Sequence, residues 1–193
     1  MAVLHGDGLY VFDVETGDEL ANHPWVPPGD GVNVCTPVVV GEQIFLSTGY
    51  AKGCTLVSFA EATGPKVQWE NKVLRNHVSG CTLYEGHLYG FDESVLKCIG
   101  LDGKERWRVR GLGKGSVAVA GGRLIVLSSK GELVVADADP AEFRELSRKK
   151  VLDGGEYWTT PVLVGGRIYC RNSLGDLVCL DHRPIRAGGE GED

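Results

Sequence analysis

Short stretches in which apolar and polar residues alternate recur along the whole chain and predict β-strands joined by tight turns. One hairpin pattern aligns four times without gaps, over residues 37–46, 81–90, 117–126 and 161–170. Its turn contains glycine in every copy, as is typical of hairpins with two-residue turns. The equivalent turn positions Gly41, Glu85, Gly121 and Gly165 are 44, 36 and 44 residues apart.

A third apolar stretch follows each hairpin and also occurs once before the first hairpin. Its five copies begin at Leu9, Leu56, Leu96, Leu133 and Leu177, with steps of 47, 40, 37 and 44 residues. Three copies continue through a glycine turn to a strand that ends at Trp25, Trp69 or Trp107. Four short strands repeated about every 41 residues are the signature of a propeller blade. The fold class predicted is an all-β propeller of four-stranded antiparallel blades, about four and a half of them in this chain.

The repeat also sets boundaries along the chain. We expect a partial blade at 1–26, full blades at 33–74, 77–110 and 115–152, a partial last blade at 157–183 and a disordered tail at 184–193. Asp139 followed by Pro140 and Glu142 predicts one helical turn before a strand over 145–152.

The turn after the third strand carries a resemblance to a known family. The segments ETGDEL (15–20), ATGPKVQW (62–69) and LDGKERW (101–107) resemble the repeat of PQQ-like, quinoprotein-type propellers. Hairpin and turn motif together cover residues 1 to about 183, and the Gly-His and Trp-Asp pairs of WD-type propellers are missing at the corresponding places. A non-enzymatic relative is the propeller lipoprotein of the machine that assembles outer-membrane β-barrels. Such propellers usually have about six to eight blades, so the resemblance implies that this chain is the C-terminal half of one.

An open arc of blades exposes unpaired strand edges and two blade faces, which recruit other chains. We therefore expect either a homodimer that completes a ring or a missing propeller half as the partner. A closed ring of four blades, with N-terminal strands supplying the missing outer strand, is the alternative.

The resemblance also bears on chemistry, because quinoprotein dehydrogenases hold PQQ with an adjacent Cys-Cys pair, a stacking tryptophan and a carboxylate-bound calcium. No Cys-Cys dipeptide occurs here, no cysteines stand at metal-binding spacing, and half of the ring is missing. We therefore expect no cofactor, no metal and no catalytic residue, and a non-catalytic scaffold that binds a protein or peptide. PQQ with calcium is expected only under the alternative, a fragment of a PQQ-dependent oxidoreductase.

Propeller sites lie where the loops between successive blades converge. Here these loops are 27–36, 75–80, 111–116 and 153–160. The candidate binding residues that they carry are Asn33, Arg75, Asn76, His77, Lys114, Glu156, Tyr157 and Trp158. Ordinary solvated loop residues are the other interpretation. His77 could serve as a general base only if Glu156 were its partner.

The remaining conspicuous side chains have structural interpretations. Trp25, Trp69 and Trp107 recur at blade period and should pack against the neighbouring blade, whereas Trp158 departs from that register. The cysteines are expected to be small buried residues, with a Cys35–Cys81 bridge as an open alternative.

Composition limits the classes of partner and the cell compartments that are expected for this protein. The 193 residues carry a net charge of −6, which argues against nucleic acid. No apolar run reaches the roughly 18 residues of a membrane span, and the N-terminus has no signal-peptide pattern. The resemblance points to a periplasmic or membrane-associated protein, although six cysteines without evident pairing are more typical of a reducing space. A designed or truncated repeat is a further interpretation.

Overall fold

The computed structural model describes residues 1–60 and 64–183, and these residues form five antiparallel sheets. The first sheet has three strands, β1 (Ala2–Leu4), β2 (Gly8–Phe12) and β3 (Glu19–Pro24). The second contains β4 (Val38–Val40), β5 (Gln43–Thr48), β6 (Gly53–Ala60) and β7 (Gly64–Asn71). The third contains β8 (Thr82–Tyr84), β9 (His87–Asp92), β10 (Val95–Gly100) and β11 (Glu105–Val109). The fourth contains β12 (Ser116–Ala120), β13 (Arg123–Leu127), β14 (Glu132–Asp137) and β15 (Glu145–Lys150), and the fifth has only β16 (Val162–Val164), β17 (Arg167–Arg171) and β18 (Leu177–Asp181).

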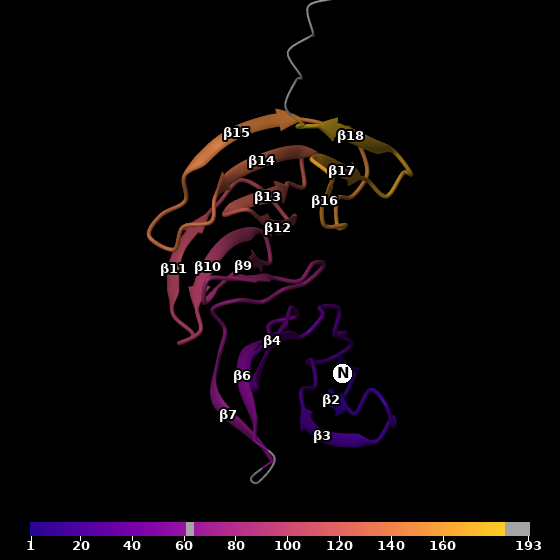
Figure 1. Cartoon of the computed structure of the whole chain (residues 1–193), viewed down its shortest axis with the longest axis vertical. Helices are drawn as coiled ribbons and strands as arrows, with labels where there is room; N and C mark the ends of the chain where they lie inside the picture. The colour runs from indigo at the N-terminus through magenta and orange to yellow at the C-terminus, as the bar shows by residue number, and fades with distance from the viewer. Residues whose placement is uncertain (61–63, 184–193) are drawn as a thin grey trace, which may run out of the picture.

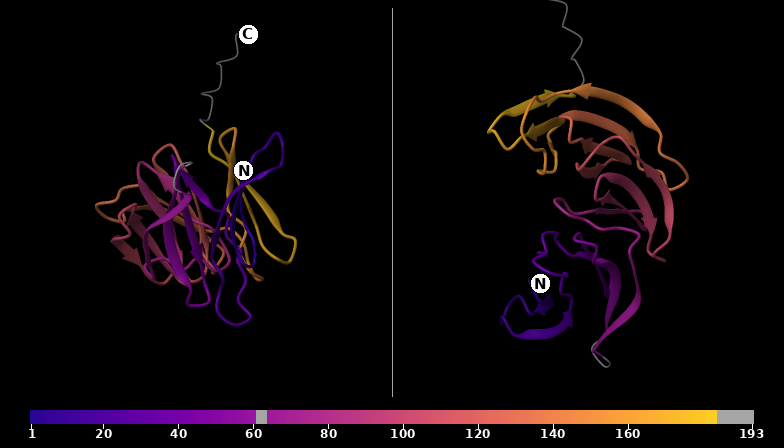
Figure 2. Two further views of the ribbon diagram at one scale, coloured as in Figure 1. Left: turned by 90° about the horizontal axis from the view of Figure 1, so that it is seen from below. Right: turned by 180° about the vertical axis from the view of Figure 1, so that it is seen from behind.

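The sheets follow one another around an open arc (Figures 1 and 2). Within each sheet the strands pair in chain order, and β7, β11 and β15 lie on the convex side of the arc (Figure 1). The all-β prediction of a partial propeller is thus confirmed. Nothing in residues 1–60 and 64–183 forms a helix of the length and apolarity needed to cross a membrane.

A bulge recurs between the third and fourth strands, and it shows that the repeat extends to backbone detail. The register shifts at Val11/Phe12, Leu56/Val57, Cys98/Ile99 and Val135/Ala136. A bulge bends a strand and increases its twist, so each outer strand can curve over its neighbour.

The core lies between the sheets, in four clusters that each join one blade to the next. Three tryptophans span these interfaces: Nε1 of Trp25 donates to Thr48 Oγ1 at 2.8 Å, Nε1 of Trp69 to Leu101 O at 2.7 Å, and Nε1 of Trp107 to Asp139 O at 2.7 Å. The acceptor belongs to the following blade each time, at the end of β5 or in the turn after β10 or β14, which confirms that these tryptophans pack between blades.

The helical turn expected at 139–142 is absent, and that prediction was wrong. Asp139 Oδ1 instead accepts a hydrogen bond from the Ala141 backbone N–H at 2.8 Å, which closes a local turn. The Asp139 carbonyl accepts a hydrogen bond from Trp107 Nε1 of the preceding blade. The disordered tail predicted for 184–193 lies outside the described residues, as do residues 62 and 63 of the second turn motif.

Candidate partner-binding face

Because strands alternate in direction within a blade, the loops that leave the fourth strands share one face with the turns between second and third strands. We call this the loop face. All eight candidate residues come from its loops. The structure places them in several different environments, which sequence position alone does not separate.

Asn33 and Asn76 hold the blades together. The Asn33 amide donates to the carbonyls of His5 and Trp25, at 2.7 and 3.0 Å, and its oxygen accepts from Thr48 Oγ1 at 2.7 Å. Asn76 is 2% exposed, and its amide donates to Phe91 O at 3.0 Å. The Asn33 side chain therefore links the first blade to the second, whereas the Asn76 amide ties its loop to β9, and both are poorly placed to meet a ligand.

His77 and Lys114 form a polar chain across the loop face. The His77 ring lies edge-on to Tyr50 with 4.7 Å between centroids, and its Nδ1 is 3.0 Å from Lys114 Nζ. Lys114 Nζ is also 3.5 Å from Glu93 Oε2. His77 is therefore partnered by Lys114, while the Glu156 backbone N–H donates to Ser173 Oγ at 3.0 Å in the loop before the fifth sheet. The structure gives no support to a His77–Glu156 acid–base pair.

Four non-glycine residues among those described have a positive φ, namely Tyr50, Ala51, Glu85 and Glu93. Tyr50 and Glu93, both in turns between second and third strands, have φ values of 55° and 55°. Non-glycine residues in the left-handed region cost free energy and concentrate at functional sites. The left-handed turns of the loop face therefore carry an aromatic ring and a carboxylate where a strain-free turn would carry glycine.

Tyr157 and Trp158 are neighbours in sequence with opposite environments. Tyr157 is 2% exposed in the cluster between the fourth and fifth sheets, and its buried hydroxyl has no hydrogen-bond partner among the described residues. Trp158 is 52% exposed. Of the two aromatic rings, only that of Trp158 is free to contact a partner.

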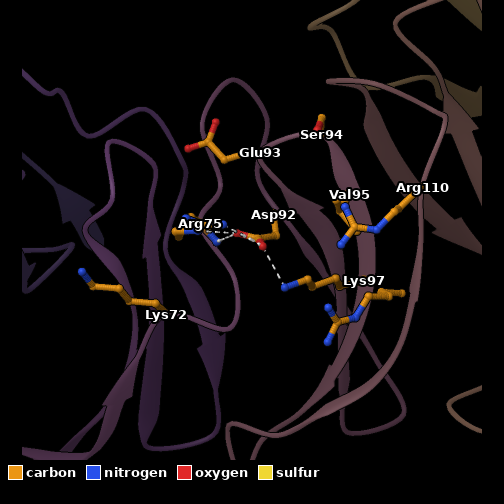
Figure 3. Close-up of a pocket in the computed structure, with 9 residues that line it drawn as sticks. Lys72, Arg75, Asp92, Glu93, Ser94, Val95, Lys97 and Arg110 are labelled. Atoms are coloured by element: carbon orange, nitrogen blue, oxygen red, sulfur yellow. Dashed lines mark hydrogen bonds and ion pairs between the residues drawn. The ribbon is translucent and has the colours of Figure 1, made fainter.

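Arg75 belongs to a buried ion-pair network around Asp92 (Figure 3). Arg75 Nε is 2.7 Å from Asp92 Oδ1, and Lys97 Nζ is 2.7 Å from Asp92 Oδ2. Burial alone would raise the pKa of Asp92, but the hydrogen bonds from Arg75 and Lys97 outweigh it and lower that pKa below its usual value. Asp92 is thus ionised and shared by two cations.

The network borders a cavity of about 480 Å³ between the second and third sheets. It is lined by Lys72, Arg75, Asp92, Glu93, Ser94, Val95, Lys97, Arg108 and Arg110. Sequence reasoning identified only Arg75 of this set. The available signal was Lys97, a lysine in the middle of the apolar strand VLKCIG, since lysine is almost never fully buried unless it is paired.

Comparison with known proteins agrees with this architecture. Residues 92–184 match the family model described as outer membrane protein assembly factor BamB. The crystal structure of BamB from Moraxella catarrhalis superposes with a TM-score of 0.68 and 16% identity, over 90% of this chain and 53% of that one. The computationally designed Ika8 protein gives a TM-score of 0.66 and 14% identity, over 91% of this chain and 52% of that one.

The chain therefore spans about half the length of the solved propellers that it matches. No curated protein matches it. The resemblance to PQQ-like propellers that the repeats indicate is confirmed, and likeness at this identity establishes the fold.

Proposed function

We propose that this propeller is a non-catalytic scaffold whose loop face binds a protein or peptide partner during the assembly of outer-membrane proteins. The observation that carries the proposal is the combination of a BamB-like fold with a polar loop face that exposes the aromatic rings of Trp158 and Tyr50, which are 52% and 38% exposed. An exposed tryptophan beside fixed donors is typical of the contacts that dominate protein interfaces.

A periplasmic or outer-membrane-associated location follows from the same likeness and is part of the proposal. The buried cysteines are compatible with an oxidising space, whereas Cys179, which was expected to be buried, is exposed. All six are free thiols, so Cys35 and Cys81 are not bridged, and burial raises the pKa of Cys35 and Cys54 to about 12. A protonated, buried thiol is a poor nucleophile and resists oxidation.

Photo-crosslinking from the loop face tests the scaffold proposal. A photoreactive phenylalanine analogue replaces Trp158 in the chain expressed in its natural host, and the matched control carries it at Leu146, which is 43% exposed on the outer strand β15. We expect crosslinks from position 158, and not from 146, to a protein of the outer-membrane assembly machinery identified by mass spectrometry. Equal crosslinking from both positions, or a quinone absorbance that appears on titration with PQQ and calcium, would overturn the proposal.

We further propose that a second copy of the chain completes the ring. The first and fifth sheets form the two ends of the arc (Figure 1). On the fifth sheet Val162, Val164 and Leu177 are 54%, 58% and 66% exposed. Two copies of a chain that spans about half of a propeller supply the length of a whole one.

Light scattering measures the mass of the protein in solution, and the proposed dimer should have about twice 20.8 kDa. A monodisperse species at 20.8 kDa would contradict the dimer.

A further inference from the structure

The cavity beside Asp92 continues into a second one on the loop face. This second cavity, of about 350 Å³, is lined by Ser94, Val95, Arg110, Gly111, Gly113, Ser129 and Lys130. Ser94, Val95 and Arg110 line both cavities. The two therefore form one groove that runs from the second sheet to the fourth, which we call the basic groove.

The basic groove is positive in a chain that is negative as a whole. Six cations line it against two carboxylates, while the chain carries a net charge of −6. Asp92 is neutralised by Arg75 and Lys97, and Glu93 is 3.5 Å from Lys114. The carboxylates of the groove are thus already engaged.

Lys97 fixes the floor of the groove and has no donor to spare. It is 7% exposed, and its Nζ contacts Asp92 Oδ2 at 2.7 Å, Val73 O at 2.8 Å and Glu105 Oε2 at 3.3 Å. An ammonium group has three donors, so all are used. Lys97 is a positioning residue that holds Asp92 and Glu105 in place.

The exposed cations above this floor are available to a ligand. Arg110, Lys130 and Lys72 form no ion pair with any of the residues at 1–60 and 64–183. Arg75 and Arg110 lie on opposite sides of the Asp92–Lys97 pair, with the Arg110 guanidinium beside Val95, while the Lys72 amino group points away from Asp92 (Figure 3). Arg110, at the junction of the two cavities, is the residue that a ligand in either part would meet.

The shape of the groove separates two classes of anion. A single phosphate is too small to contact the cations of both cavities at once, whereas an extended chain with spaced carboxylates can contact cations in both. Gly111, at φ 91°, has open space where a side chain would stand, so the wall there is bare backbone that a peptide can approach. We propose that the basic groove binds an extended acidic segment of the protein partner, an inference that rests on the proposed scaffold function.

A direct titration tests the ligand class. The probe is a fluorescein-labelled ten-residue peptide of alternating Glu and Ser, compared with its Gln–Ser counterpart by fluorescence anisotropy at low salt. We expect the Glu peptide to bind at least about tenfold more tightly, and added salt to weaken it because exposed charges are screened. Equal binding of the two peptides would overturn the proposal.

Two variants that remove one positive charge each locate the binding. Arg110→Gln should weaken the Glu peptide about five- to tenfold, whereas Lys149→Gln, on the exposed outer strand β15, should leave it unchanged. Arg110 is exposed and unpaired, so its variant should melt at the wild-type temperature. An equal loss in both variants would show attraction by overall charge and would contradict the groove.

Competition with inorganic phosphate decides between anions. If millimolar phosphate displaces the Glu peptide completely at constant ionic strength, the site selects a compact anion and the peptide proposal fails. The scaffold proposal is judged separately, by the crosslink from position 158. If that crosslink forms but the Glu peptide does not bind, the scaffold is retained and the groove is rejected. If no crosslink forms from position 158 in the otherwise unchanged protein, the scaffold is rejected.

Discussion

The third and fifth sheets contain the same cross-strand pair in two different environments. Cys98 pairs with Tyr89 in the third sheet, and Cys179 pairs with Tyr169 in the fifth. Tyr89 and Cys98 are 1% and 0% exposed, while Cys179 is exposed and Tyr169 is half-buried. The third sheet has an outer strand, β11, and a following blade to cover the pair, and the fifth sheet has neither among the described residues. Burial of this pair is therefore set by the outer strand and the following blade rather than by the paired strands themselves.

Removing the side chain that covers the third-sheet pair should have the largest effect. Trp107 packs on Tyr89 and Phe143 with ring centroids 5.9 and 5.5 Å apart. We expect Trp107→Ala to lower the free energy of unfolding by about 3–5 kcal/mol, through lost packing and a lost hydrogen bond to Asp139. Urea titration measures it, with Leu146→Ala on the exposed outer strand β15 as the control, expected to change stability by less than about 1 kcal/mol. Similar losses in both variants would contradict the blade-dependent burial.

The ion pairs of Asp92 should give the next largest effect, and they make it depend on pH. We expect Asp92→Asn to cost about 3 kcal/mol near neutral pH, because it leaves the buried Lys97 without its main counter-charge. The pKa of Asp92 is lower in the folded protein than in the unfolded chain. Its contribution is therefore fully present above the unfolded-state pKa near 3.8 and is lost as the pH falls through the lower folded-state pKa.

Urea titrations of both proteins between pH 7 and pH 2 measure this dependence. The stability difference between wild type and Asp92→Asn should shrink towards low pH. A difference that stays constant over that range would contradict the assignment of Asp92 as an ionised buried carboxylate.

The thiols of the two sheets should differ in reactivity. Burial raises the pKa of Cys98 to about 11, whereas Cys179 is exposed to solvent. Thiol labelling followed by mass spectrometry should modify Cys179 within the mixing time and Cys98 only at the rate of unfolding. If the proposed dimer buries the fifth sheet, dilution that dissociates it should accelerate labelling of Cys179 and leave Cys98 unaffected.

The same residues show which features of the structure the sequence could predict. The repeat predicted the blades, and the period of Trp25, Trp69 and Trp107 predicted contacts between them, because a periodic sequence imposes a periodic structure. The repeat could not predict burial that depends on the following blade. Cys98 and Cys179 occupy the same position of the repeat, yet one is buried and the other is exposed. A loop position likewise could not separate the buried Tyr157 from the exposed Trp158.

Substitutions of Tyr157 and Trp158 should have the smallest effects on stability, and they should differ in their effect on partner binding. Trp158→Ala should cost less than about 1 kcal/mol, because the side chain is half exposed, yet it should abolish most partner binding if the loop face is the binding surface. Tyr157→Phe removes a buried hydroxyl that has no partner among the described residues, so it should stabilise the protein by about 1 kcal/mol and leave binding unchanged. Thermal melts and partner capture on the two variants measure both effects. A large loss of stability in Trp158→Ala would place that ring in the core, and Tyr50 would then be left as the exposed aromatic residue of the loop face.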